Sequence, residues 1–427
     1  METKRNYTLP IIMMILLLGM IGFVTNLAAP MGVVWKAQLD AGNFLGILGN
    51  AANFIAYAVM GFPAGILLQR YGYKKTALIA VAVGFIGVCI QMLSGYTGES
   101  AAFGVYLLGA FVAGFCMCML NTVVNPMLNT LGGGGNKGNR LIQIGGSFNS
   151  LLATFTPAVV GVLIGQAASP HIKDVFPVIY TMMGVFALVF IVLLAVSIPE
   201  PHAERATDSL GTLVSGALKF RHFIFGAIGV FVYVGVEVGT PNMLLYWLSD
   251  PAVSSVGAAA AGIVAGTYWF LMLIGRLVGA SIGGKVSSKK MLTTCASVAV
   301  ILILIAIFSP TSTQISVPAF EASSLSFILT PVPINAIFLI LVGLCTSVMW
   351  GCVFNLAVEG LGKYVAVASG LFMVMVCGGG IIPAIQAFVA DQASYLTSYW
   401  VMVIGFGYLL FYALIGSKNV NKDVSVD

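Results

Sequence analysis

Charged residues are scarce in this chain of 427 residues. Only 8% of its residues are Asp, Glu, Lys or Arg, against roughly 25% in an ordinary soluble domain. So few charges cannot cover a soluble surface, which excludes a cytosolic enzyme, a secreted disulfide scaffold and a disordered chain. Because apolar residues make up 59% of the chain, we expect a protein that spans a membrane several times.

Histidine and cysteine offer no metal or catalytic site. The three histidines fall in expected loops or at helix ends, and the seven cysteines fall in apolar runs without metal-ligand spacing. The glycine-rich segment 132–139 lacks the Gly-Lys-Ser/Thr order of a phosphate-binding loop. The formal charge of +5 is spread over short loops and forms no nucleic-acid patch. We predict that the chain is no enzyme, needs no cofactor or metal, and binds no nucleic acid.

Long uninterrupted apolar runs indicate helices. Residues 11–34 contain no charge, and a spanning helix needs about 20 such residues. A barrel strand would instead alternate in polarity over about ten residues. We therefore predict an all-α membrane protein with twelve transmembrane helices. The expected spans are 8–35, 42–69, 76–95, 101–130, 141–167, 174–198, 222–248, 257–284, 290–308, 332–358, 364–390 and 395–416.

The longest polar interval separates six spans from six. It runs from Pro199 to His222 and holds several acidic and basic residues, so we interpret it as a cytoplasmic linker with a short surface helix. We predict an N-terminal six-helix bundle over residues 1–198, a linker over 199–221, and a C-terminal six-helix bundle over 222–427 with a short cytoplasmic tail.

Basic residues determine the expected orientation. If the N-terminus lies in the cytoplasm, all but three of the 19 basic residues fall in cytoplasmic loops and tails. The exceptions are Lys36 and Lys173 outside, and Arg276 within a span. The reverse orientation would contradict the positive-inside rule. We therefore expect both termini to be cytoplasmic.

The two halves of the chain resemble each other. The pair Lys74–Lys75 follows the second span, and Lys289–Lys290 follows the eighth, about half the chain later. Likewise, Asn26–Met31 in the first span matches Glu237–Met243 in the seventh. Transporters with two such halves bind substrate between them near the membrane midplane. The repeat thus predicts two pseudo-symmetric bundles with a central site.

Glu237 is the one acidic residue well inside an expected span. Ionisable groups in the bilayer are costly and generally serve substrate or ion pathways. Its neighbours are glycine and valine, so we expect the carboxylate to be protonated, to bind a cation or to hydrogen-bond a substrate. We predict that Glu237 contacts substrate and is the coupling site. A buried acid with only a structural role is the alternative.

Asparagines within the spans form a second candidate set. An amide has two donors and an acceptor without a charge, which suits the hydroxyls of a neutral sugar. For each residue, a structural hydrogen bond between helices is the alternative. The candidates for substrate binding are Asn26, Asn121, Asn125, Asn149, Asn242 and Asn355.

Trp350 lies in the middle of the span 332–358, next to Gly351. Sugar rings have apolar C–H faces that pack on aromatic planes, so sugar sites usually combine aromatic rings with polar groups. We expect Trp350 to line the same cavity as the asparagines.

Motifs along nearly the whole chain point to a known family. The loop Gly65–Lys75 resembles the signature between the second and third helices of the major facilitator superfamily, with Gln69 where an acid is usual. Further motifs resemble the fucose–galactose–glucose:proton symporter family within it. These motifs are Gly22–Asn26, Asn125–Pro126, Phe148–Ser150, Tyr233–Gly239, Gly275–Arg276, Gly360–Tyr364, Ser369–Leu371 and Gly379–Pro383.

This resemblance implies the major facilitator fold and a bacterial inner-membrane sugar importer that works by alternating access. By position, Asn149 matches a substrate-contacting Asn of the family, and Glu237 fills a position that is Glu or Gln. Two family acids that bind protons and substrate are replaced here by Ala29 and Asn121, and a family Gln is replaced by Gly146. Proton coupling of the family's type is therefore not implied, and the site should be roomier or rearranged.

The sequence thus predicts a secondary active transporter, expected to be monomeric, that imports a neutral mono- or disaccharide. Coupling to a proton or sodium would act through Glu237, and an uncoupled uniporter is an alternative. An efflux transporter for drug-like or lipid substrates is the rival, but its pocket should hold few amides. The short loops and the lack of a soluble output domain argue against a non-transporting membrane sensor.

Overall fold

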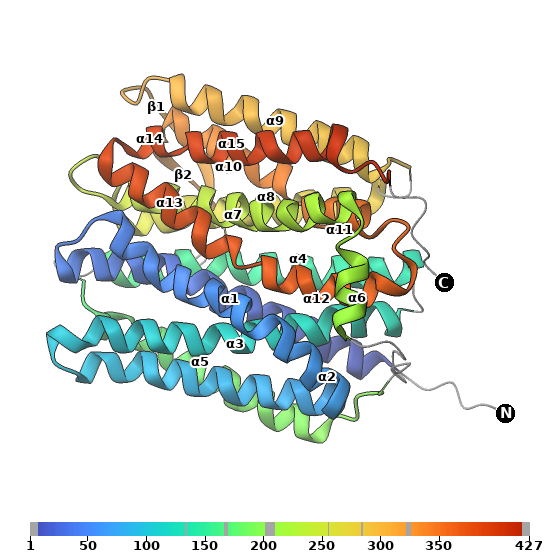
Figure 1. Cartoon of the computed structure of the whole chain (residues 1–427). Coiled ribbons are helices and arrows are strands. Elements are labelled where there is room, and N and C mark those ends of the chain that lie inside the picture. The colour runs from blue at the N-terminus through green and yellow to red at the C-terminus, as the bar shows by residue number, and fades with distance from the viewer. Residues whose placement is uncertain are drawn as a thin grey trace.

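Long helices running side by side form the protein, as Figure 1 shows. The computed structural model describes residues 7–132, 135–165, 170–200, 210–254, 256–282, 285–321 and 326–420. In this part of the chain, eleven helical segments are long and apolar enough to cross a membrane. One of them, Asn43–Tyr96, has 54 residues and is too long for a single crossing. It accounts for two of the twelve expected spans.

The first half of the chain forms five long helices. The second of these contains a break at Gly72, whose φ of 80° and ψ of 177° are not helical. This break separates the spans that the sequence placed at 42–69 and 76–95. The helices are α1 (Thr8–Leu39), α2 (Asn43–Leu93), α3 (Glu99–Leu131), α4 (Gly135–Gly165) and α5 (Phe176–Ala195), with short 3₁₀ turns at Ser94–Tyr96 and Ile172–Val175.

Glu200 explains how the chain restarts a helix after Gly72. Its Oε2 accepts a hydrogen bond from the backbone N–H of Tyr73 at 2.7 Å, and its Oε1 accepts one from that of Lys74 at 3.0 Å. The carboxylate thus satisfies the free N–H groups at a helix start and matches the positive end of the helix dipole. A Cβ at Gly72 would lie 2.5 Å from the Glu200 carboxylate.

The second half contains more, shorter helices because several crossings are interrupted. Three crossings are each divided into two helices: α10 with α11, α12 with α13, and α14 with α15. A 3₁₀ turn at Gly362–Tyr364 lies between α11 and α12, and a π-helical turn at Tyr412–Gly416 follows α15. The helices are α6 (Leu210–Ala217), α7 (Arg221–Ser249), α8 (Gly257–Ile282), α9 (Ser288–Phe308), α10 (Ile334–Thr346), α11 (Met349–Val358), α12 (Val365–Met375), α13 (Gly378–Gln392), α14 (Tyr395–Ser398) and α15 (Trp400–Phe411).

The interval between the halves contains the short helix α6. This helix packs against α12 at the end of the bundle where α1 begins and the π-helical turn lies (Figure 1). Residues 201–209 of the predicted linker, with Glu204, Arg205 and Asp208, lie outside the described residues. The assignment of this end to the cytoplasm, and the exact domain boundaries, stay predictions.

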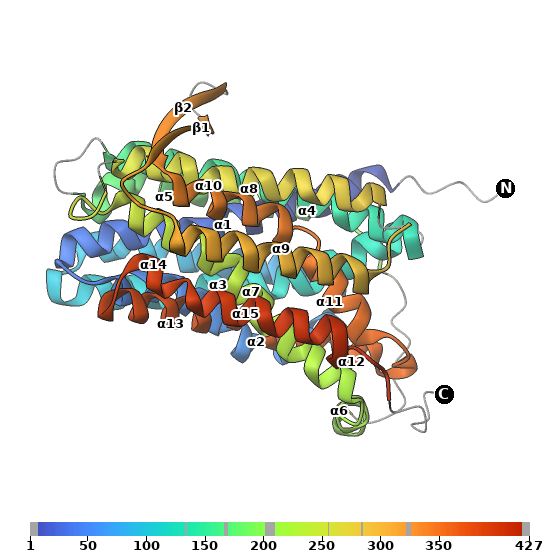
Figure 2. The ribbon, with the colours of Figure 1, turned by 90° about the horizontal axis from the view of Figure 1, so that it is seen from above.

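A β-hairpin is the element that the sequence analysis did not expect. Strands β1 (Gln314–Glu321) and β2 (Ser326–Pro333) pair antiparallel, with Val317 opposite Thr330. Figure 2 shows the hairpin projecting from the bundle beside α8 and α10. Its β-branched residues favour strands, but so short a segment between two spans was not distinguished from a loop.

Two helix pairs hold the halves of the chain together. Helix α4 packs along α8, and α2 packs along α13. Gly262 of α8 lies so close to α4 that a Cβ there would be 2.3 Å from the carbonyl oxygen of Pro157. In the second pair, Asn50 Nδ2 donates to the carbonyl of Gly379 at 2.8 Å. Small residues at such contacts allow the close backbone approach on which packing in lipid depends.

A candidate substrate cavity between the two halves

A cavity lies between the helices that precede α6 and those that follow it. Helices α1, α2, α3 and α4 line one side, and α7, α8, α11 and α12 line the other. Six of the eight candidate residues from the sequence line this cavity: Asn26, Asn121, Asn125, Asn149, Glu237 and Trp350. Residues from both halves of the chain therefore meet at one central place, which is where the repeat suggested a site.

Asn242 and Asn355 do not line this cavity. Asn242 is buried within α7, and Asn355 is exposed on α11. Each follows a lining residue, Glu237 or Trp350, by five positions, and five residues turn about 140° around a helix axis. The structure therefore does not support a contact between either residue and a substrate in this cavity.

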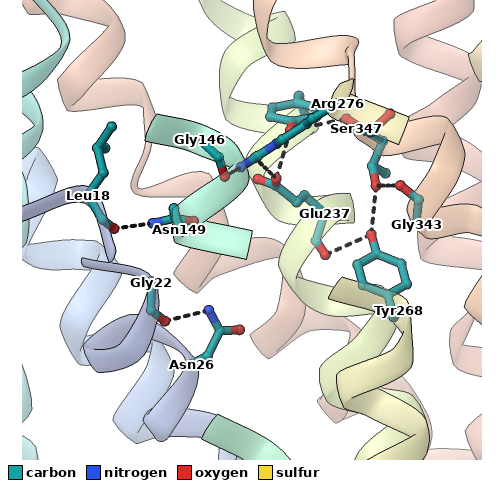
Figure 3. A network of polar contacts seen from close by, with 12 residues as sticks. Leu18, Gly22, Asn26, Gly146, Asn149, Glu237, Tyr268, Arg276, Gly343 and Ser347 are labelled. Atoms are coloured by element: carbon teal, nitrogen blue, oxygen red, sulfur yellow. Dashed lines mark hydrogen bonds and ion pairs between the residues drawn. The ribbon is translucent and has the colours of Figure 1, made fainter. Parts of the chain in front are cut away.

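Glu237 has a charged partner, as Figure 3 shows. Arg276 Nη2 of α8 lies 3.5 Å from Glu237 Oε1 of α7. The hydroxyl of Tyr233, one turn earlier on α7, donates to the same oxygen at 2.7 Å. The carboxylate is therefore not bare, because Arg276 and Tyr233 are its partners, and the sequence-based expectation did not include either of them. Both side chains of the pair are only about one-seventh exposed, at 15% for Arg276 and 13% for Glu237.

Arg276 also reaches across the cavity. Its Nη1 donates to the carbonyl of Gly146 on α4 at 2.5 Å, so one guanidinium contacts both halves of the chain. A Cβ at Gly146 would lie 3.3 Å from this nitrogen, and a longer side chain would compete for the same space. The glycine thus leaves the room that Arg276 occupies.

A second set of hydrogen bonds holds the backbone of Glu237. The hydroxyl of Tyr268 on α8 donates to the Glu237 carbonyl at 3.1 Å and lies 3.0 Å from Thr346 Oγ1 on α10 (Figure 3). Tyr268 is fully buried. The backbone of the acid is therefore held by a tyrosine of α8 that is itself bonded to α10.

The cavity asparagines direct their amide nitrogens to the protein. Asn26 Nδ2 donates to Gly22 O and Asn149 Nδ2 donates to Leu18 O, both at 2.8 Å (Figure 3). A carbonyl only accepts, so these contacts fix which end of each amide is the nitrogen. Within the described part of the chain, no donor reaches the Oδ1 atoms of Asn26 and Asn149. These oxygens remain acceptors for a bound molecule.

Asn121 and Asn125 form a connected pair on one face of α3. Asn121 Nδ2 donates to the hydroxyl of Tyr57 on α2 at 3.0 Å, and Asn125 Nδ2 donates to the backbone carbonyl of Asn121 at 3.2 Å. Tyr57 also lines the cavity. The sequence left open whether these amides make structural hydrogen bonds or line a cavity. They do both, because they bond to the protein and face the cavity.

Aromatic rings face the asparagines from the second half of the chain. Trp350 lies 6.1 Å from Tyr233, centroid to centroid, at an interplanar angle of 51°. Trp269 of α8 also lines the cavity. The lining thus combines hydrogen-bond acceptors on one side with aromatic planes on the other, as sites for polar molecules with apolar faces do.

Arg276 is the main site residue that sequence reasoning missed, although the motif Gly275–Arg276 was noticed. The signal was present, since a basic residue inside one span and an acidic residue inside another are expected to pair in lipid. Tyr57, Gln143 and Ser347 were also not selected. They line the cavity, but polar residues of these types are common in helices and carry no distinguishing signal.

Comparison with known proteins agrees with this architecture. Residues 11–384 match the family described as Major Facilitator Superfamily. The chain is 29% identical over 429 residues to a glucose/galactose transporter of Brucella abortus biovar 1 (strain 9-941), which covers 98% of this chain and 96% of that protein. It is 21% identical over 452 residues to the L-fucose-proton symporter of Escherichia coli (strain K12), covering 98% and 95%.

A solved structure has the same fold. The crystal structure of the transporter FucP in its outward conformation superposes with a TM-score of 0.69 at 19% identity, covering 97% of this chain and 100% of that one. The long match to the family, the helical crossings and the central cavity lead to one conclusion. The chain belongs to the Major Facilitator Superfamily, and it is a multi-pass membrane transporter, not an enzyme.

Proposed function

We propose that this protein is a secondary transporter that imports a neutral mono- or disaccharide across a bacterial inner membrane. The observation that carries the proposal is the central cavity, in which the charges of Glu237 and Arg276 compensate each other among amides and aromatic rings. A cavity without net charge favours a neutral polar substrate over an anion or a cation. The relatives described as sugar transporters support the same substrate class.

The lining suggests how a sugar would bind. Its hydroxyls would donate to the open Oδ1 atoms of Asn26 and Asn149, while its C–H face would pack on Trp350 or Trp269. Gln143, at the cavity wall, has a side-chain amide that both donates and accepts. A sugar bound to the asparagines and tryptophans in this way would leave Arg276 in contact with Glu237 and Gly146.

Coupling, in this proposal, acts on the Glu237–Arg276 pair. Protonation of Glu237 would remove the charge that holds one side of the guanidinium, and Arg276 would then depend on its bond to Gly146 of α4. Because this bond crosses between the two halves, the protonation state would bias their arrangement. Proton and sugar would then affect each other's binding reciprocally. Sodium coupling and uncoupled uniport remain the alternatives that transport assays distinguish.

The cavity lining argues against the rival function of drug or lipid efflux. A pocket for such substrates is mostly apolar, whereas this one contains four asparagines and an ion pair. Burying these groups against an apolar substrate would cost free energy without compensating hydrogen bonds. The proposed importer works as a monomer with both termini in the cytoplasm, as the basic loops predict.

Uptake into proteoliposomes tests the function directly. The purified protein is reconstituted and supplied with labelled glucose, galactose, fucose and a disaccharide, each with a proton gradient, a sodium gradient or neither. Saturable uptake of at least one sugar is expected, and the gradient that raises accumulation identifies the coupling ion. The matched controls are Asn149→Leu in the cavity, which should lose uptake, and Asn355→Leu outside it, which should not. Uptake of none of these sugars would contradict the proposal.

A further inference from the structure

The cavity extends toward only one end of the bundle. Its lining on α3 and α4 includes Asn125 and Gln143, close to the connection between those helices. On α1 the lining stops at Asn26 and on α7 at Val238, well before either helix reaches its C-terminal end. The opposite end, where α1 turns into α2 and where α7 and α13 finish, is therefore closed.

Five polar residues close this opposite end, and we call them the Lys36 cluster: Lys36, Asn43, Asp250, Asp391 and Tyr395. The ammonium of Lys36 donates to Asn43 Oδ1 at 2.5 Å and to the hydroxyl of Tyr395 at 3.1 Å. The Tyr395 hydroxyl in turn donates to Asp250 Oδ2 at 2.6 Å. The ammonium also lies over the rings of Tyr246 and Tyr395, at 5.1 and 5.6 Å from their centroids.

Asp391 fastens the second half of the chain to the start of α2. Its Oδ1 accepts from the backbone N–H and the side-chain amide of Asn43 at 2.7 and 2.8 Å, and its Oδ2 accepts from the N–H of Phe44 at 2.8 Å. A carboxylate that caps a helix N-terminus is favoured by both the free N–H groups and the helix dipole. The cluster thus joins α1 and α2 to α7, α13 and α14.

Beneath the Lys36 cluster lie polar atoms without partners. The Nδ2 of Asn242 and the hydroxyl of Tyr246 on α7, and both amide atoms of Gln386 on α13, are buried and make no hydrogen bond. Gln386 is fully buried, and the Tyr246 hydroxyl presses against Gly32 of α1. An unpaired buried polar group costs free energy, so this packing has a cost that separation of the helices would relieve.

We propose that the Lys36 cluster is a latch that keeps this end shut, and that Asn242, Tyr246 and Gln386 line the passage that opens when it breaks. The inference rests on the proposed function, because the passage serves the same neutral sugar. An open passage would supply the missing partners, first as water and then as sugar hydroxyls. The proposal also gives Asn242 a role. This residue would face the substrate in the conformation in which this end is open, and not in the conformation that exposes the central cavity.

Thiol labelling measures the opening. Asn242→Cys is introduced alone and together with Lys36→Met, which removes the ammonium and keeps an apolar chain of similar length. An impermeant maleimide is applied to the purified protein, and mass spectrometry locates the label so that native cysteines are counted separately. We expect labelling at position 242 at least tenfold faster in the Lys36→Met background. Equal rates would overturn the proposal.

Two comparisons control for unfolding. Leu244→Cys probes the same helix at a fully buried position and should stay unlabelled in both backgrounds, whereas faster labelling there too would indicate general loosening and overturn the latch. If Lys36→Met does not fold, Asp391→Asn serves instead, since an amide cannot accept all three of the hydrogen bonds in the same way. Labelling needs no sugar, so a failed uptake assay would refute the proposed function and leave this result intact.

Discussion

The central cavity and the Lys36 cluster use similar side chains in opposite ways. In each, one basic residue contacts oxygen atoms contributed by both halves of the chain. At the cluster the charged groups are joined through Asn43 and the Tyr395 hydroxyl, and the unpaired polar atoms are sealed beneath them. In the cavity the unpaired amide oxygens face open space. A binding site and a closed end therefore differ in where their unpaired hydrogen-bonding atoms lie. In the binding site these atoms face open space, and at the closed end they are buried.

The largest effect is expected from removing the basic member of the central pair. Arg276→Leu leaves Glu237 buried without its countercharge, and breaking a buried pair in this way costs about 3–5 kcal/mol. We expect a clear drop in the thermal unfolding temperature of the purified protein. Arg276→Lys, which keeps the charge, should lose less. An unchanged unfolding temperature in Arg276→Leu would show that the pair carries no such energy.

Removing the acidic charge should separate coupling from binding. Glu237→Gln keeps the shape of the side chain and an oxygen that accepts from Tyr233 and Arg276, but it cannot titrate. We expect the loss of gradient-driven accumulation with sugar counterflow retained, both measured in proteoliposomes. Wild-type accumulation would show that Glu237 is not the coupling site. Loss of counterflow as well would assign Glu237 to sugar binding or to structure.

A smaller effect is expected at the cavity amides. Asn121→Leu removes the bond to the Tyr57 hydroxyl and a polar group from the lining, and an unpaired partner costs about 1–3 kcal/mol. We expect insertion and folding to persist and sugar affinity in calorimetric titration to fall at least tenfold. Asn355→Leu, on the exposed side of α11, is the matched control. Equal affinities of the two variants would remove Asn121 from the site.

The smallest effect is expected from one hydroxyl of the latch. Tyr395→Phe keeps the ring under Lys36 but loses the hydrogen bonds to the ammonium and to Asp250, worth about 1 kcal/mol net. Labelling of Asn242→Cys should rise by about fivefold, less than in the Lys36→Met background. A larger rise than with Lys36→Met would mean that the hydroxyl, and not the ammonium, holds this end shut.

The crossings could be predicted from the sequence because lipid imposes a simple requirement. Each span needs an unbroken apolar run, and such runs are visible directly. The separation of the spans 42–69 and 76–95 was predicted, and the structure has a break between them at Gly72. The interruption between α12 and α13 was not predicted, since it depends on what each helix packs against. The hairpin β1–β2 was missed because it is short and lies between two long apolar runs, whose signal in the sequence is much stronger.

The cavity was predictable in outline but not in its contacts. A polar residue inside a span is conspicuous, which is how Glu237, Asn149 and Trp350 were selected. Which face of the helix each one occupies is less visible, and this is why Asn355 was selected although it lies outside the cavity lining. Lys36 was interpreted only as a charge in an outer loop, because its contact with Tyr395 joins residues 359 positions apart.

The contact between Glu200 and the restart of α2 has a consequence for dividing the chain. Glu200 follows the last crossing of the first half, yet its carboxylate completes a helix that begins more than a hundred residues earlier. Gln69 in this loop is uncharged, and Glu200 supplies the negative charge at this turn. A split version of the protein, with its halves expressed as separate polypeptides, should therefore be cut after Glu200 and not at residue 198.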